Sequence, residues 1–209
     1  MMTRLILRLI PLSVAPLVVI FGLIRLQPAR SALEELFADS ANCAALCVLG
    51  LEPGVTTLGD LDAALRVHPW VADVRYNRAP ATDSGLISWA WSGAQPAVID
   101  ARRQGLASIQ DGVLAWVELP TTIAIGELWL LAPPSTTRAS IAQIQGRRHA
   151  IVSGRHFDGA LSAGVTVPCP VRSAMFWRAA IRMWVIVPEP PMPGEPTAQI
   201  DLPTWGGCP

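Results

Sequence analysis

The sequence contains no lysine and few charged residues of any kind. Of its 209 residues only 15% are charged and 51% are hydrophobic, and all 16 cationic side chains are arginines. The first 30 residues hold four arginines and no acid, so the remainder has 12 arginines against 16 acids, a net charge of −4. Binding to nucleic acid through phosphates needs a concentrated basic face. We therefore expect no nucleic-acid partner, and we expect the excess of apolar residues to lie in lipid or in an interface.

Catalytic signatures are also missing. The sequence has no nucleophile elbow, phosphate-binding loop, dinucleotide fingerprint or zinc-binding pattern. It therefore predicts no catalytic, cofactor-binding or metal site, and a protein that is not an enzyme. One polar cluster offers an alternative, an extracytoplasmic hydrolase that uses His149, His156 and Asp158 as acid and base. We favour a solvated hairpin loop for His156 and Asp158, because they are only two residues apart in an extended segment.

An apolar run covers Leu5–Leu26, and its uncharged part between Arg8 and Arg25 is 16 residues long. This length falls between a signal-peptide core and a full membrane span. If both arginines extend to the interfaces, a helix over the run crosses the roughly 30 Å of hydrocarbon. We favour this membrane anchor. The alternative is a signal peptide cleaved near Ala29–Ser31, which would make the protein secreted, and both interpretations place the rest of the chain outside the cytoplasm.

The four cysteines, Cys43, Cys47, Cys169 and Cys208, all follow the apolar run. In an exported chain an even number of cysteines favours disulfides, and three connectivities exist. The spacing of Cys43 and Cys47 places both thiols on one side of a turn, so a local bridge is feasible and leaves Cys169 for Cys208. Buried free thiols are the alternative. A metal site lacks the histidines or paired Cys-x-x-Cys knuckles that it needs.

Hydrophobic spacing predicts an α+β domain with two similar halves. Apolar residues recur at helical spacing over Leu58–Leu65, and Pro69 ends that helix. Strands follow at Val71–Arg75 and Ile87–Trp91, and Asp111-Gly112 forms a two-residue hairpin turn. Leu58-Gly59-Asp60-Leu61 is matched 67 residues later by Ile125-Gly126-Glu127-Leu128, again in an apolar helix ended by proline. The order of elements therefore predicts two helix-plus-antiparallel-strand units packed as one compact domain.

Further strands and a C-terminal strap complete this expected organisation. The predicted strands are Pro96–Arg102, Ser140–Gln145, Ala150–Ser153, Ala160–Val167 and Ala174–Val187. From Pro188 the chain has seven prolines in 22 residues, which is typical of an extended segment. The expected parts are an anchor (1–30), a stem with Cys43 and Cys47 (31–52), a first unit (53–120), a second unit (121–187) and a proline-rich tail (188–209).

The sequence has eight tryptophans, an unusual number for a chain of this length. Trp89 and Trp91 lie on one face of a predicted strand together with Ile87. We favour a place in the core for this pair. The alternative is an interaction surface that stacks a sugar, a pigment or a peptide. We also expect Trp129, Trp177 and Trp184 to be buried.

Two resemblances rest on the residues around the first helix. The pattern from Gly54-Val55-Thr56 through Leu65 to Pro69 resembles the SmpA/OmlA-type lipoproteins of outer-membrane assembly and related β-lactamase-inhibitor-like domains. The sequence departs from the lipoprotein pattern because it has no lipobox. A Cys-x-x-x-Cys pair followed by Pro-Gly-Val-Thr-Thr and His-Pro-Trp-Val is similar to a set of uncharacterised membrane-anchored bacterial proteins. These resemblances imply a layered α+β fold that binds other proteins.

We therefore expect a membrane-anchored extracytoplasmic binding or assembly module, with a protein partner in or near the membrane and no cofactor. A second hypothesis is an accessory subunit of a membrane protein complex, which would expose a wide apolar patch. The hydrolase is the third hypothesis.

Overall fold

The computed structural model describes residues 36–37, 43–78, 84–188 and 208. The predicted anchor, part of the stem and most of the proline-rich tail lie outside these residues. In the part that is described, no helix is long and apolar enough to cross a membrane.

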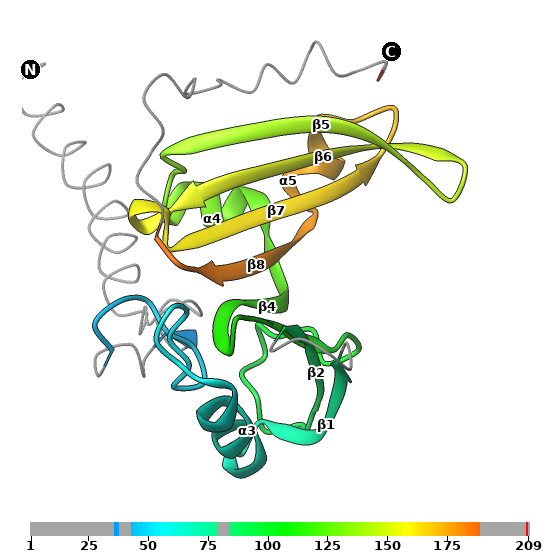
Figure 1. Cartoon of the computed structure of the whole chain (residues 1–209). Coiled ribbons are helices and arrows are strands. Elements are labelled where there is room, and N and C mark those ends of the chain that lie inside the picture. The colour runs from blue at the N-terminus through cyan, green and yellow to red at the C-terminus, as the bar shows by residue number, and fades with distance from the viewer. Residues whose placement is uncertain (1–35, 38–42, 79–83, 189–207, 209) are drawn as a thin grey trace, which may run out of the picture. The chain divides into compact units, whose positions relative to one another are not determined.

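The described strands form one antiparallel sheet of eight. They are β1 (Val71–Arg78), β2 (Gly85–Trp91), β3 (Gly105–Gln110), β4 (Val113–Ala124), β5 (Thr136–Ile144), β6 (Arg147–His156), β7 (Leu161–Pro168) and β8 (Ala180–Ile186). Their order across the sheet is β1-β2-β3-β4-β8-β7-β6-β5 (Figure 1). The helices are α3 (Leu58–Val67), α4 (Ile125–Leu131), the short α5 (Ser173–Trp177) and the 3-10 turn η2 (Phe157–Gly159). The prediction of a compact α+β domain is confirmed.

Helix α3 begins and ends where the sequence predicts. The Thr57 side chain accepts a hydrogen bond from the backbone N–H of Asp60 at 3.3 Å, which satisfies one of the free donors of the first turn. Leu61 and Leu65 are buried, and the helix stops at His68 because the residue before a proline disfavours helical backbone.

The predicted hairpin turn at Asp111-Gly112 is also confirmed. Both residues have positive φ, 51° and 80°, as a two-residue turn between β3 and β4 requires. Glycine adopts such angles without steric cost, and aspartate tolerates them better than most residues.

Two strand predictions are wrong. Residues 96–102 form turns, with a backbone bond from Ile99 N–H to the Pro96 carbonyl, and they meet β4 through an isolated bridge between Ile99 and Thr121. Residues 174–187 divide into α5 and β8 rather than forming one long strand. A short apolar segment fits both the helical and the strand period of hydrophobic residues. Here residues 173–177 form a helix, and its residue Phe176 is buried.

Each of the two longer helices precedes four strands. Helix α3 precedes β1 to β4, and α4 precedes β5 to β8, with β4 and β8 paired at the centre of the sheet. Leu61 and Leu128, which are 67 residues apart, are both fully buried. The matching glycines differ, because Gly59 is exposed whereas a Cβ at Gly126 would lie 2.9 Å from the Trp177 carbonyl oxygen. The recurring tetrapeptide therefore corresponds to a shared leucine position and not to a shared glycine environment.

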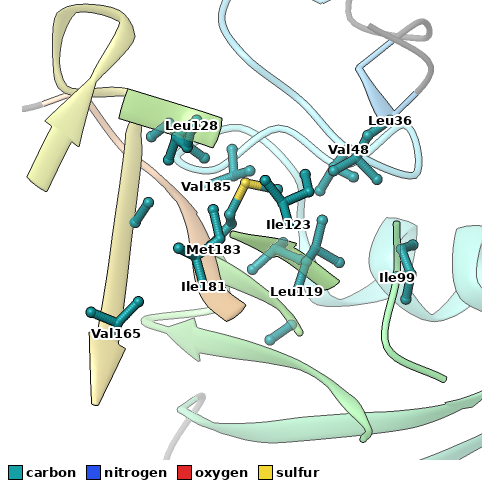
Figure 2. Close-up of a cluster of buried hydrophobic side chains, with 14 of the residues drawn as sticks. Leu36, Val48, Ile99, Leu119, Ile123, Leu128, Val165, Ile181, Met183 and Val185 are labelled. Carbon is teal, nitrogen blue, oxygen red and sulfur yellow. The ribbon is translucent and has the colours of Figure 1, made fainter. Parts of the chain in front are cut away.

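The core lies on one face of the sheet. Leu119 and Ile123 of β4, Met183 and Val185 of β8 and Leu128 of α4 meet in one buried cluster (Figure 2). Helix α3 contacts β1 and β4, α4 contacts β4 and α5, and α5 contacts β7. The described helices therefore pack on this face of the sheet.

Trp89 and Trp91 belong to this core. Trp89 is fully buried and Trp91 nearly so, with the indole N–H of Trp91 donating to the Arg103 carbonyl at 2.8 Å. Gly105 leaves the room that Trp89 needs, since a Cβ there would lie 2.2 Å from the indole ring. The favoured core position is confirmed, and the alternative of an interaction surface made by this pair is wrong because Ile87, Trp89 and Trp91 share the buried face of β2.

Both disulfide pairings that the spacing favoured are present. Cys43 bonds Cys47, and Cys169 bonds Cys208 across 39 residues of chain. Cys208 is buried, and its carbonyl accepts a hydrogen bond from Arg148 Nη1 at 3.1 Å. Disulfides persist in oxidising compartments, which is consistent with an extracytoplasmic location.

Candidate functional site

The sheet face opposite the core carries polar and aromatic side chains. Along β8, Arg182, Trp184 and Ile186 alternate with buried residues and so point to this second face. The register places Trp116 of β4 opposite Ile186, and Ser162 of β7 opposite Trp184. The two strands at the centre of the sheet thus bring two tryptophans to the face that the described helices leave uncovered.

Two hollows of about 290 Å³ and 300 Å³ lie on this face. Side chains that line the first include Trp116, Arg138, Arg155 and Ser162. Side chains that line the second include Arg103, Thr166 and Arg182. Ser153 and Trp184 border both. We call the surface formed by these nine residues the arginine groove.

Trp184 is held in a fixed position at the centre of the arginine groove. Its indole N–H donates to Glu118 Oε2 at 3.0 Å, and Arg182 Nη1 donates to Glu118 Oε1 at 3.3 Å. Glu118 is buried, so these two donors compensate a carboxylate that would otherwise be costly to bury. A Cβ at Gly164 would lie 3.3 Å from the indole and 3.0 Å from the Val152 carbonyl oxygen, so the packing against the ring is tight at this position.

Four arginines line the arginine groove. Arg103, Arg138, Arg155 and Arg182 come from four separate parts of the chain, and the described residues that line the two hollows include no acid. Glu118 lies below this surface and is paired with Arg182. Guanidinium groups bind carboxylates and phosphates in two-point geometry, so the arginine groove has the side chains to accept anionic groups.

Comparison with known proteins adds no relative. No family model, curated protein or solved structure matches the chain. The resemblance to SmpA/OmlA-type domains and to membrane-anchored bacterial proteins therefore stays a prediction.

The histidines and the aspartate of the hydrolase hypothesis are not brought together. His149 and His156 lie seven positions apart on β6, which corresponds to about 23 Å at the rise of a strand and places them on opposite faces. Asp158 is exposed in the turn that follows β6. The three side chains therefore do not form the acid-base constellation that this hypothesis needs.

His156 does not lie on a solvated loop, so that prediction is wrong for this residue and correct only for Asp158. His156 is 1% exposed because it continues the buried alternation of Ala150 and Val152 on β6. Its Nδ1 donates to the Ala132 carbonyl at 2.6 Å, at the end of α4. Burial lowers the pKa of the imidazole below its usual value, so the ring is held neutral.

The described part of the chain contains no candidate metal site. No group of three or more His, Cys, Asp or Glu side chains there is arranged to hold a metal ion.

No sequence pattern predicted the arginine groove. The expectation that Trp129, Trp177 and Trp184 are buried is wrong, because Trp177 is exposed and the other two are only half-buried. Trp184 borders both hollows. The alternation of Arg182, Trp184 and Ile186 with Ile181, Met183 and Val185 could have placed Trp184 on the second face. Nothing local in the sequence could have joined Arg103 to Arg155, because only the strand order brings these segments to one surface.

Proposed function

We propose that this protein is a membrane-anchored extracytoplasmic binding module without a catalytic role, and that its arginine groove binds an acidic, extended segment of a partner protein. The observation that carries the proposal is the pair of half-buried tryptophans on the uncovered sheet face, surrounded by four arginines.

The chemistry of these side chains supports a protein ligand. Tryptophan and arginine are the residues most often found at the energetic centres of protein interfaces. The arginine fork pairs with carboxylates in two-point geometry, which adds specificity to affinity. Because Trp184 is fixed by Glu118, an extended segment can pack against its ring without first ordering it.

The extracytoplasmic location is supported by the two disulfides and by the apolar run that precedes them. The run at Leu5–Leu26 supplies the anchor in this proposal, with the described domain outside the cytoplasm.

An accessory subunit of a membrane protein complex is the second candidate. It is favoured by the apolar side chains that α4 exposes, above all Leu130, which is 88% exposed. Both candidates bind another protein, and they differ in which face of the domain that protein covers.

Chemical crosslinking in cells that produce groove variants tests the proposal. Cells that produce the full chain are treated with a crosslinker, extracted in mild detergent and analysed for crosslinked partners. Arg103→Glu and Ser162→Glu each place an acid in one of the two hollows, so repulsion should reduce recovery of the partner at least tenfold. Arg75→Glu is the matched control, because Arg75 lies exposed on β1 and outside the arginine groove.

The melting temperatures of all three variants should stay close to that of the parent protein, since the replaced side chains are not part of the core. Recovery of the same partner at the parental level from both groove variants would overturn the proposed binding surface.

A further inference from the structure

A second surface lies on α4 and α5, on the helical side of the sheet. Leu130 is 88% exposed, Leu131 54% and Trp177 37%. Leu130, Trp177, Gly126 and the half-buried Trp129 line a hollow of about 330 Å³. We call Trp129, Leu130, Leu131 and Trp177 the α4–α5 patch.

The α4–α5 patch is rigid. The rings of Trp129 and Trp177 meet edge to face with centroids 5.9 Å apart. Gly126 allows α4 to approach α5 so closely that any added Cβ would collide with the Trp177 backbone. Trp129 also contacts the ring of His156, whose hydrogen bond to Ala132 fixes the end of α4. The large apolar side chains are therefore presented to solvent by a fixed scaffold and not by a loosely packed helix.

The chemistry around the α4–α5 patch matches a bilayer surface. Arg172 and Arg178 are exposed at the two ends of α5, and Glu127 is the exposed acid on α4. Tryptophan and leucine beside arginine is the composition of surfaces that insert at the boundary between headgroups and acyl chains. The arginines provide attraction to anionic headgroups.

The length of the connecting chain decides between a bilayer and a more distant occupant. Leu36 is buried in the domain core, and nine residues separate it from Leu26 at the end of the predicted anchor. Nine residues span at most about 30 Å. If the anchor is in the membrane, Leu36 cannot move farther than this from lipid, so the bilayer is an apolar surface that stays within reach of the domain.

We infer that the α4–α5 patch docks on the lipid bilayer in which the chain is anchored, with Leu130 and Trp177 inserted among the headgroups. This inference rests on the proposed anchor. Because the arginine groove lies on the opposite face of the sheet, such docking leaves the groove turned away from the membrane and open to a partner.

Tryptophan quenching in nanodiscs tests the inference. The full chain is reconstituted in nanodiscs of phosphatidylcholine and phosphatidylglycerol, with or without bromine on the acyl chains. The predicted anchor contains no tryptophan, so quenching by brominated lipid reports on the tryptophans that follow it. We expect clear quenching in the parent protein, and we expect the Trp129→Phe, Trp177→Phe double variant to lose most of it.

Leu130→Asp and Leu131→Asp should reduce the quenching at least twofold, since a charge at the headgroup boundary opposes insertion. Val67→Asp is the matched control, because Val67 is 81% exposed at the end of α3 and lies outside the α4–α5 patch. It should leave the quenching unchanged.

Co-fractionation of each variant with nanodiscs separates this inference from the proposed anchor. A parent protein that does not co-fractionate refutes the anchor and, with it, the docking. A parent protein that co-fractionates but shows no difference between brominated and ordinary lipid overturns the docking alone. Burial of Trp177 only after a partner protein is added would assign the α4–α5 patch to protein and also overturn the docking.

Discussion

The two halves of the sheet differ most in their helices. Helix α3 has ten residues and a side-chain cap at Thr57, whereas α4 has seven residues and no side-chain cap. Helices of this length are marginal without tertiary contacts, so α4 depends on the packing of Ile125 and Leu128. The 88% exposure of Leu130 on this short helix is accounted for by the proposed docking of the α4–α5 patch on the bilayer.

The face of the sheet that the described helices leave uncovered also differs between the halves. On β1, Arg75 is exposed and is paired with Asp73 at 2.9 Å. At the centre of the sheet, Arg182 is paired with Glu118 and lines the arginine groove with side chains of both halves, among them Trp116 of β4 and Trp184 of β8. The arginine groove therefore spans the junction of the two halves, whereas the α4–α5 patch belongs to the second half alone.

Removing the equivalent leucines tests whether the halves fold as one unit. Leu61→Ala and Leu128→Ala each create a cavity in a fully packed site, so each should lower the free energy of unfolding by about 2–5 kcal/mol. Denaturant unfolding followed by tryptophan fluorescence and circular dichroism measures this. Because β4 and β8 join the halves, both variants should keep a single transition. Two separate transitions in either variant would show that the halves are independent.

The indole hydrogen bonds of Trp184 and Trp91 allow the stability of the arginine groove to be compared with that of the core. Trp184→Phe leaves the buried Glu118 without one donor and should cost about 1–3 kcal/mol, because the acceptor is charged. Trp91→Phe removes only a bond to the Arg103 carbonyl and should cost about 1 kcal/mol. Thermal unfolding of the two variants checks the order, and a larger loss for Trp91→Phe would contradict it.

The N-terminal caps of α3 and α4 can be tested in opposite directions, by removing the one that exists and adding the one that is absent. Thr57→Ala removes the cap of α3 and should cost about 1 kcal/mol. Ala124 is the uncapped N-terminal position of α4 with extended backbone, so Ala124→Ser should gain up to about 1 kcal/mol. Both changes are measured as shifts in the denaturation midpoint. Destabilisation by Ala124→Ser would mean that the side chain at this position is constrained by β8 and not by the helix.

The smallest expected effect is a dependence of stability on pH that arises from His156. Burial lowers the pKa of its imidazole in the folded protein, so the unfolded chain binds a proton first as the pH falls. The contribution to stability is therefore complete above the unfolded pKa of about 6.5, and it is lost as the pH falls from that value through the lowered pKa of the folded protein. His156→Gln should flatten the stability curve between about pH 5 and pH 7 relative to the parent protein. An unchanged slope in His156→Gln would show that this imidazole does not cause the pH dependence.

Local sequence signals placed much of the fold. Thr57 and Pro69 bounded α3, Asp111-Gly112 fixed the turn between β3 and β4, and the alternation around Trp89 assigned that side chain to the core. The turn at Gln145-Gly146, with φ of 49° and 77°, uses the same backbone geometry but a less distinctive first residue, so it was missed.

The sequence by itself determined helices α3 and α4 and the hairpin turn at Asp111-Gly112, because each depends on a few neighbouring residues. It favoured the cysteine pairing through the short spacing of Cys43 and Cys47. Tertiary structure alone decided both proposed binding surfaces. The arginine groove exists because β4 pairs with β8 and so aligns four segments that are distant in the chain. His156 is buried because it lies with Ala150 and Val152 on the face of β6 that packs on the core. Leu130 is exposed because the buried face of the short helix α4 consists of Ile125 and Leu128. Charge, burial and exposure at these positions follow from the strand order of the whole sheet, which no local pattern specifies.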